Sequence, residues 1–311
     1  MHRLPTWPDA SDPQVSSLLA RCCFPVGAIA VTCAVSGGPD SSALLVLAAA
    51  AGLDVTAVHV DHQLRGGSAD EALVVAALAE RVGADFRSVR APVAPGAGLE
   101  ARARAARHSA VGPHAVFGHT ADDQAETVLL RLLRGTGPSG LAAMTVERHP
   151  ILALRRSETR ALCDHLGIDV VHDPTNESSV HTRNRVRAEV LPLLDDVARR
   201  DVVPLLCRLA ELSAEQAAWV DDLAATLDPT DARSLAAAPV PLASTAVRRW
   251  WIEATGEPLP PDAAAVRRVL EVAAGDVVRA DVAAGWRVAR SAGKLRWERT
   301  ERTERPPLGR R

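Results

Sequence analysis

A short glycine turn constrains this chain more than any other feature of its sequence. Residues 36–42 read S-G-G-P-D-S-S, after the apolar run 28–35 and before the alanine- and leucine-rich segment 43–51. Glycine has no Cβ, so the backbone can approach an anion closely, and the first turn of a helix adds unpaired N–H groups. Pro39 suits a first helical position. The turn predicts a phosphate site between a strand and a helix; the alternative is a turn that only caps the helix.

Two common phosphate loops are excluded by the residues around the turn. The lysine and hydroxyl of a Walker A loop do not follow the second glycine, and the third glycine of the dinucleotide fingerprint is missing. The turn instead resembles the S-G-G-x-D-S signature of the PP-loop ATP pyrophosphatases, which implies ATP cleavage between the α and β phosphates and AMP transfer. The resemblance implies ATP contacts for the whole turn: Ser36, Gly37, Gly38, Pro39, Asp40, Ser41 and Ser42. It also implies that Mg2+ arrives with ATP and that Asp40 helps to bind it, without a dedicated metal site.

Length and composition indicate two globular domains. The chain has 311 residues, whereas a single core usually stops growing at about 250 to 300 residues. The formal net charge is -2, so a basic coat is absent and RNA contacts must come from local arginine clusters. The five cysteines form no C-x-x-C pair, which argues against a zinc, iron–sulfur or redox site. The N-terminus does not match a secretory signal, and no apolar run is long enough to span a membrane, so we expect a cytoplasmic protein.

Strands that alternate with helices predict a parallel α/β sheet in the first part of the chain. We expect strands at 28–35, 53–60, 86–89, near 115 and at 150–154, and helices at 15–22, 43–51, 68–82, 99–110, from about 120, and at 157–166 with Ser157 as N-cap. The predicted domains are a Rossmann-like PP-loop domain over 1–195 and a smaller α-rich domain over 196–311. In the second domain we expect helix caps at Ser213, Asp231, Ser244 and Asp262, short strands within 276–299, and a disordered tail from about residue 300.

The end of the second predicted strand reads H-V-D-H-Q-L-R-G-G. Ligands of open α/β sheets gather at such carboxyl ends, so function is favoured there. A metal cluster of His59, Asp61 and His62 is disfavoured, because neighbouring strand residues point in alternating directions. Arg65 next to two glycines is typical of a loop with an anion-binding arginine; the alternative is a solvated turn.

A second informative stretch, residues 115–144, predicts a strand, a turn and a long helix. Thr120 can cap that helix with Asp123 at the third position. Capping does not explain all the acidic residues, because Asp122, Asp123 and Glu126 place three carboxylates at the start of the helix. This start lies at the edge of the sheet where ATP–magnesium or a cationic substrate would lie. Asp123 and Glu126 share a face. We expect this pair to bind a ligand, and the alternative is capping alone.

Arginines gather in three other segments: the helix at 99–110, the end of the helix after residue 120, and residues 183–187. The helix after residue 120 ends in arginines and a glycine-rich loop, R-G-T-G-P-S-G, that could follow a phosphodiester backbone or form an ordinary C-cap turn. Arginines at the start of the helix after residue 181 oppose its dipole, which favours a facing anion such as triphosphate or RNA. The candidate phosphate or tRNA contacts are Arg65, Arg107, Arg131, Arg134, Arg183, Arg185 and Arg187.

Several motifs together resemble the bacterial tRNA(Ile)-lysidine synthase family. They are S-G-G-P-D-S, H-V-D-H-Q-L-R, G-H-T-A-D-D-Q-A-E-T, R-G-T-G-P-S-G-L and D-P-T-N with R-N-R-V-R, over residues 28–195. The resemblance implies that ATP adenylates C2 of the wobble cytidine of a tRNA(Ile) with a CAU anticodon, and that free lysine then displaces AMP to form lysidine. For this reaction we expect catalytic roles for Asp40, Asp123, Glu126 and Arg183, with His59 and His119 beside the nucleotide.

Other functions remain open from the sequence. PP-loop tRNA thiolation enzymes need a persulfide cysteine or cluster ligands, and the cysteines here stand apart or sit adjacent near the N-terminus. A glutamine-dependent amidotransferase would need a glutaminase partner, and a nucleotide-binding RNA module would not consume ATP. Trp250 and Trp251, next to two arginines, could stack on bases. We expect Trp219 and at least one of that pair to lie in a core.

Overall fold

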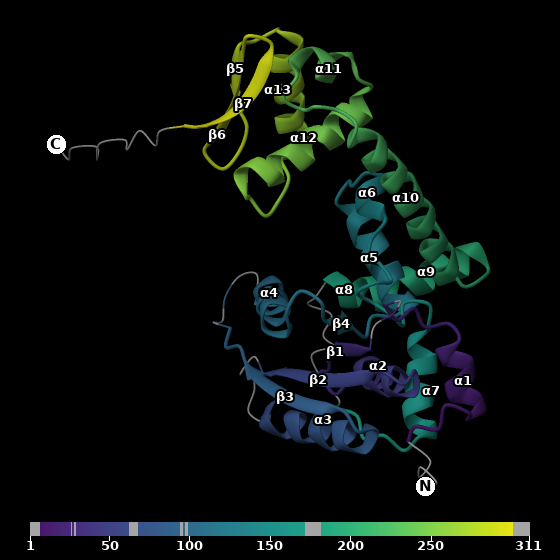
Figure 1. The fold of residues 1–311 in the computed structure, drawn as a ribbon. Helices are drawn as coiled ribbons and strands as arrows, with labels where there is room; N and C mark the ends of the chain where they lie inside the picture. Colours follow the sequence, from purple (N-terminus) through teal and green to yellow (C-terminus); the bar gives the residue numbers. More distant parts are fainter. Residues whose placement is uncertain are drawn as a thin grey trace, which may run out of the picture. The chain divides into compact units, whose positions relative to one another are not determined.

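The computed structural model describes residues 7–25, 27, 29–61, 68–93, 96, 99–171 and 182–300. The chain divides into two compact units, Met1–Ala214 and Glu215–Arg311 (Figure 1). The first unit extends beyond the boundary at 195 suggested by the sequence, because Leu191, Val202 and Val203 share a buried cluster with Ala125 and Leu129. Within the described part of the chain, no helix is long and apolar enough to cross a membrane.

The first unit is built on a four-stranded parallel sheet in the order β3–β2–β1–β4. The strands are β1 (Ala30–Ala34), β2 (Asp54–Asp61), β3 (Asp85–Arg90) and β4 (Val116–Phe117). Side chains alternate between the two faces. Val31 and Cys33 join the larger buried cluster, whereas Ala34 joins the cluster on the other face with Phe117.

Helices cover both faces of this sheet (Figure 1). The larger cluster packs the sheet against α1 (Pro13–Leu19), α2 (Pro39–Ala50), α3 (Ser68–Val82) and α7 (Arg156–His165). The smaller cluster includes Val111 of α4 (Leu99–Val111). α2 is buried along most of its length, which explains why its alanines and leucines show no polar stripe. The predicted α/β class is confirmed.

The strand expected at 150–154 is wrong, because the structure has successive turns there. The Leu152 N–H donates to the His149 carbonyl at 3.0 Å, and the Leu154 N–H donates to the Ile151 carbonyl at 2.9 Å. Pro150 has no N–H for a sheet ladder. The apolar residues of this segment are nevertheless buried. The apolar run therefore indicated burial correctly but did not indicate the backbone conformation.

α5 (Ala121–Leu133) follows β4 directly and leads into the short α6 (Pro138–Leu141). Further along the chain, α8 (Thr182–Arg185) continues through a π-helical turn (Val186–Val190) into α9 (Leu191–Ala198). The arginines predicted at a helix start therefore do lie there. α10 (Val203–Ala224) crosses the boundary between the two units.

The second unit packs helices against a small antiparallel sheet. Its elements are α11 (Ala232–Ala237), α12 (Val240–Thr255), α13 (Ala263–Ala274), β5 (Arg279–Asp281), β6 (Trp286–Ser291) and β7 (Lys294–Arg299). Asp231 and Asp262 cap helices as predicted. Ser213 and Ser244 do not, because each lies inside a longer helix. The disordered tail expected from about residue 300 lies almost wholly outside the described residues.

The tryptophans of this region differ from expectation. Trp250 and Trp251 are both buried and pack against Trp297, one tilted and one edge-on, with ring centroids 4.5 and 5.1 Å from that of Trp297. Their position in the core removes them as base-stacking candidates. Trp219 keeps 66% of its surface exposed, so its assignment to a core is wrong. It lies on α10, a helix whose apolar residues occur on more than one face.

Candidate active site

The glycine turn lies between the end of β1 and the first turn of α2. Gly37 has φ +87°, a backbone conformation that favours glycine, and its carbonyl accepts from the Val171 N–H at 2.9 Å. Gly38 is the N-cap of α2 and has no side chain to bond the first N–H groups. Ser41 closes the turn, since its Oγ donates to the Gly38 carbonyl at 3.0 Å and accepts from the Ser36 N–H at 3.2 Å. Backbone N–H groups at the start of α2 are therefore available to an anion.

The start of α2 packs against the end of β4 through Gly118. A Cβ on Gly118 would lie 2.6 Å from the Asp40 carbonyl oxygen and 2.8 Å from the Ser41 Cα. Both are backbone atoms and cannot rotate away. This close approach sets the distance between the phosphate turn and the start of α5, which begins three residues after Gly118.

Gly118→Ala is therefore expected to push the phosphate turn away from β4. We expect a loss of roughly 1–3 kcal/mol in unfolding free energy, typical of overpacking, together with weaker ATP binding. Urea denaturation and calorimetry with α,β-methylene-ATP measure the two effects. Gly137→Ala is the control, because a Cβ there meets no heavy atom within 4 Å. Equal stability and equal ATP binding in both variants would contradict the close-packing argument.

Asp40 points from the first turn of α2 toward α7. It accepts a short hydrogen bond from the Thr159 hydroxyl, and its Oδ2 lies 3.5 Å from the Arg156 Nε. Burial raises the pKa of the Asp40 carboxyl to about 6, against the opposing effects of the Thr159 hydrogen bond and the Arg156 charge. A carboxylate whose negative charge is only partly compensated by its neighbours is suited to attract a cation.

Glu126 is the most deeply buried charged group of the site. Its side chain has no exposed surface and is bonded to arginines from two helices. The Arg183 Nε donates to Oε2 at 2.6 Å, the Arg187 Nε donates to Oε1 at 2.7 Å, and the Arg156 Nη1 donates to Oε1 at 3.2 Å. The anion that these arginines face in this structure is thus a carboxylate of the same chain.

Asp123 shares two of these arginines and also closes the helix cap. Its Oδ1 accepts from the Arg156 Nη2 at 2.9 Å and from the Arg183 Nη2 at 3.0 Å. Its Oδ2 accepts from the Thr120 N–H and hydroxyl at 2.9 and 3.0 Å. Burial raises the pKa of the Asp123 carboxyl, but the Arg156 and Arg183 charges outweigh burial, so the pKa lies below its usual range. The predicted capping role and the predicted shared face with Glu126 both hold.

Asp122 pairs with a different arginine, Arg155. It accepts from the Arg155 Nε and Nη2, both at 3.1 Å, and from the Arg156 backbone N–H at 2.8 Å. Arg155 also bonds Asp201. α7 begins at Arg156 with Arg155 as N-cap, and Glu158 accepts from the Arg155 N–H at 2.8 Å. Ser157 is therefore not the cap that the sequence suggested.

The two histidines predicted beside the nucleotide occupy different environments. His59 is buried two residues before the end of β2, and its Nδ1 lies 3.0 Å from the carbonyl oxygen of Val35, the residue just before the phosphate turn. His119 lies just before α5, and its Nδ1 is 2.9 Å from His149 Nδ1. Burial lowers the pKa of both His119 and His149, so this pair is neutral at physiological pH.

The remaining predicted arginines do not all face the site. Arg131 donates to the carbonyls of Gly140 and Ala143 and holds the loop at α6, and Arg185 pairs with Glu189 on the surface. Arg107 is half-buried in α4, where burial lowers its pKa, and Arg134 is exposed. Arg65, His62 and the D-P-T-N segment lie outside the described residues.

Three participants were not predicted from the sequence. Arg156, Thr159 and His149 all lie in or next to the segment that was expected to be a strand and a capped helix. The adjacent arginines of L-R-R-S-E-T were the available signal. Charged side chains are rarely buried unless they are paired, so the acidic start of the helix after residue 120 needs arginine partners.

The buried or partly buried cysteines have thiols that burial keeps protonated. Burial raises the pKa of Cys163 to about 12 and that of Cys207 to about 11, and burial likewise raises the pKa of Cys22 to about 12. A thiolate nucleophile needs the opposite shift. Among the described residues, no group of three or more His, Cys, Asp or Glu side chains could hold a metal ion.

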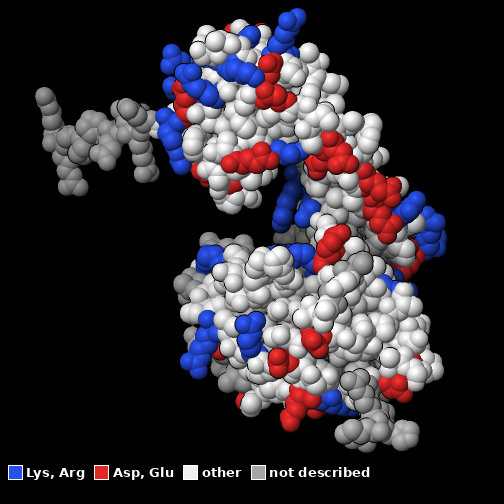
Figure 2. Space-filling model, viewed as in Figure 1, with Lys and Arg blue, Asp and Glu red and all other residues white. Residues whose placement is uncertain are grey.

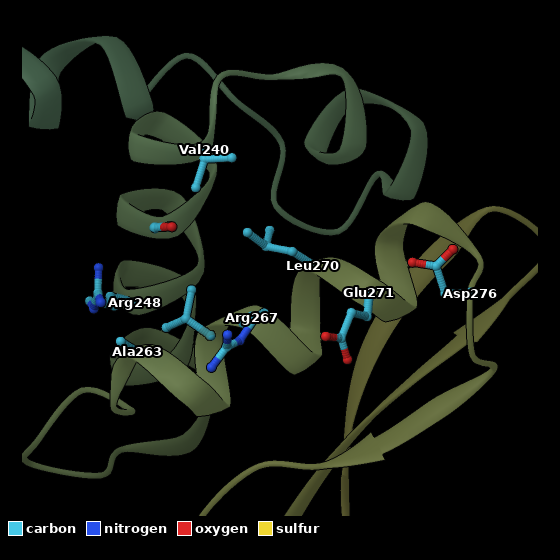
Figure 3. Close-up of a pocket in the computed structure, with 9 residues that line it drawn as sticks. Val240, Arg248, Ala263, Arg267, Leu270, Glu271 and Asp276 are labelled. Atoms are coloured by element: carbon cyan, nitrogen blue, oxygen red, sulfur yellow. The ribbon is translucent and has the colours of Figure 1, made fainter.

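Another concave feature lies in the second unit, where α12 and α13 line a cavity of about 610 Å³ (Figure 3). Arg248 and Arg267 lie toward one end, and Glu271 and Asp276 lie toward the other. The cavity contains none of the motif residues and has no single charge sign. Figure 2 shows the same mixture of acidic and basic side chains over the visible face of each unit. A uniformly basic RNA surface is therefore not visible on that face.

The sequence of this chain is similar to those of known proteins. The model of the PP-loop domain family matches residues 11–194. The tRNA(Ile)-lysidine synthase of Nocardia farcinica is 43% identical over 248 residues, which cover 74% of this chain and 78% of that protein. The protein of the same name from Mycobacterium leprae is 40% identical over 245 residues, 72% of this chain and 76% of that protein.

A solved structure supports the fold alone. The U34-tRNA thiolase NcsA from Methanococcus maripaludis, with its [4Fe-4S] cluster, aligns with a TM-score of 0.50 at 16% identity. The alignment covers 65% of this chain and 77% of that chain. At this identity the likeness carries no information about the reaction.

Proposed function

This chain belongs to the tRNA(Ile)-lysidine synthase family of PP-loop proteins, and from that premise we propose how its residues carry out ATP-dependent lysidine synthesis. The proposed substrates are ATP, free lysine and a tRNA(Ile) with a CAU anticodon, and the proposed target is C2 of the wobble cytidine. The observation that carries the proposal is the juxtaposition of the phosphate turn with Asp123 and Glu126 through one shared side chain, Arg156. The proposed nucleotide site and the proposed lysine site would thus share the Arg156 side chain.

ATP would bind at the start of α2. The N–H groups beyond Gly38 and the positive end of the helix dipole suit the triphosphate. Asp40 fits Mg2+, because Mg2+ takes oxygen ligands and is usually held by one or two carboxylates plus substrate phosphates. The raised pKa of the Asp40 carboxyl supports this assignment, since it marks a carboxylate that lacks full compensation. Bound Mg2+ would neutralise the charge that develops on pyrophosphate as it leaves.

The reaction would proceed in two displacements. The O2 atom of cytidine attacks the α-phosphate of ATP, the bond to the β-phosphate breaks, and pyrophosphate leaves. The lysine ε-amine then attacks C2, and the C2–O2 bond breaks to release AMP. Adenylation matters because a carbonyl oxygen is a poor leaving group and AMP is a good one. Binding in the correct orientation supplies much of the rate.

Asp123 and Glu126 would receive the lysine ammonium or deprotonate it before attack. Both carboxylates lie on one face of α5 and are buried. The role of Arg183 in neutralising phosphate charge stays a prediction, because its guanidinium contacts both carboxylates from α8 in this structure. The tRNA contacts assigned to Arg65, Arg107, Arg131, Arg134, Arg185 and Arg187 stay predictions, as does action in the cytoplasm.

Incorporation of labelled lysine tests this function directly. We expect label to enter a tRNA(Ile) transcript with a CAU anticodon when ATP and Mg2+ are present. The control transcript carries uridine at the wobble position and is expected to stay unlabelled. If neither transcript is labelled while RNA still stimulates pyrophosphate release, ATP cleavage would stand and lysine ligation would be rejected.

A further inference from the structure

Arg156 joins the nucleotide side of the site to the carboxylate side. Its guanidinium contacts Asp40 of α2 and both Asp123 and Glu126 of α5, at 3.5, 2.9 and 3.2 Å. Its backbone N–H donates to Asp122 at 2.8 Å, which fixes the main chain at the start of α7. The side chain keeps 29% of its surface exposed, whereas that of Glu126 keeps none. The guanidinium is therefore partly open to solvent, while the backbone at the start of α7 is held in place.

The α5 carboxylates are saturated with donors in this arrangement. Both Glu126 oxygens accept two hydrogen bonds each from guanidinium groups. Asp123 Oδ1 accepts from two guanidinium groups, and its Oδ2 accepts from Thr120. A carboxylate oxygen offers about two acceptor positions. A lysine ammonium can bond these carboxylates only after an arginine has moved away.

The charges of the cluster lead to the same requirement. Asp40, Asp123 and Glu126 carry three negative charges, and Arg156, Arg183 and Arg187 carry three positive charges. An added ammonium would leave one positive charge uncompensated in a buried place, which is costly. Triphosphate at the start of α2 supplies negative charge next to Arg156. Of the three arginines, Arg156 is the one that the described structure pairs with Asp40 of that turn.

We propose that Arg156 closes the lysine site until ATP is bound, and that it exchanges the α5 carboxylates for the triphosphate when ATP arrives. Arg156 is thus a positioning residue, and bound ATP tightens the binding of lysine. The inference rests on the proposed function, because it assigns lysine to Asp123 and Glu126. It adds a coupling between the two ligands and the residue that imposes it.

Coupling of this kind is reciprocal. If ATP tightens lysine binding by some factor, lysine must tighten ATP binding by the same factor. We expect a factor of about 10 to 100, within the range usual for coupled sites. After Arg156 has moved to the triphosphate, Arg183 and Arg187 remain bonded to Glu126 and partly compensate its negative charge.

The test measures lysine binding with and without nucleotide. Labelled lysine and the full-length protein are brought to equilibrium in dialysis with Mg2+, either alone or with saturating α,β-methylene-ATP, which cannot be cleaved between the α and β phosphates. Wild-type protein is expected to bind lysine about 10 to 100 times more tightly with the analogue. Titration of the analogue with and without lysine should return the same factor.

Variants of neighbouring arginines identify the residue responsible. Arg156→Gln is expected to bind lysine without the analogue and to show less than about a twofold further gain with it, because its closing contact is gone. Arg156→Lys keeps the positive charge, and its gain in lysine affinity with the analogue is expected to lie between those of Arg156→Gln and the wild-type protein. Arg155→Gln is the matched control, since Arg155 is adjacent and similarly exposed but pairs with Asp122 and Asp201. It is expected to keep the full dependence.

The outcomes separate this inference from the proposed function. Equal lysine affinity of the wild-type protein with and without the analogue overturns the inference, whatever the variants do. Undiminished dependence in Arg156→Gln overturns the role of Arg156. Either result is compatible with lysine incorporation into tRNA, so the proposed function would survive. Absence of lysine binding under every condition, together with absence of incorporation, would overturn both.

Discussion

Asp40→Asn is expected to abolish most of the tRNA-dependent release of pyrophosphate. The substitution keeps the shape of the side chain and an oxygen that can accept from Thr159, but it removes the charge that we assign to Mg2+–ATP. We expect a fall of at least about 100-fold in kcat, the scale for loss of one preorganised electrostatic contact to a transition state. Pyrophosphate release in the presence of tRNA(Ile) transcript and lysine measures it.

This variant is expected to lose activity without losing its fold. Burial raises the pKa of the Asp40 carboxyl to about 6, so the ionised side chain lowers the stability of the folded protein at neutral pH. A neutral asparagine removes that penalty, and the thermal midpoint should stay equal or rise. Asp54→Asn, at the exposed start of β2, is the control and should keep full activity. Normal pyrophosphate release by Asp40→Asn would reject the assignment of the phosphate turn.

Glu126→Gln is expected to weaken both the fold and the reaction. The carboxylate compensates Arg156, Arg183 and Arg187 in a place without solvent, and a neutral amide would leave an excess of positive charge there. Removal of one partner from a buried ion pair typically costs about 3–5 kcal/mol of stability. Urea denaturation followed by circular dichroism measures this loss, and lysine incorporation should fall to background.

A surface pair provides the control for this substitution. Glu189 pairs with Arg185 four residues earlier, and both side chains are largely exposed. Glu189→Gln should therefore leave the urea midpoint and lysine incorporation unchanged, since exposed pairs contribute little. If Glu126→Gln were as stable as Glu189→Gln, the cluster would not be the buried, mutually compensated set of charges described here. If it were unstable but fully active, Glu126 would have a structural role alone.

The fold of the first unit was largely predictable because its signals are local. The apolar run, glycine turn and helix start around residue 38 are contiguous, and the alternation of strands and helices limits the sheet to a parallel arrangement. Prediction failed at 150–154, where an apolar run is buried in turns. Burial and strand conformation leave the same apolar signature over so few residues. It failed again at Trp219, because α10 carries apolar residues that this chain leaves exposed.

The candidate site was predicted in part. Asp123 and Glu126 could be placed together because helical spacing puts residues three apart on one face. Their partners could not be identified, since Arg156 and Arg183 reach them from helices 30 or more positions further along the chain. The burial of His59 could not be predicted, because the sequence does not show how far the buried part of β2 extends. Its Nδ1 lies 3.0 Å from the carbonyl oxygen of Val35, the residue before the phosphate turn, and its place beside the nucleotide stays a prediction.

By itself the sequence determined the kind of phosphate turn, the parallel α/β class and the two carboxylates of α5. Each of these depends on residues close together in the chain, where backbone geometry is set by glycine, by proline and by helical or strand periodicity. Which charges meet depends instead on how distant segments of the chain pack together. Arg183 and Arg187 were expected to face phosphate or RNA, and in this structure they contact Asp123 and Glu126. Arg156, which the sequence did not single out, joins Asp40 to the same cluster. Burial makes such charges depend on one another, because removal from water forces each carboxylate to find a cation, and the available cations come from distant segments of the chain.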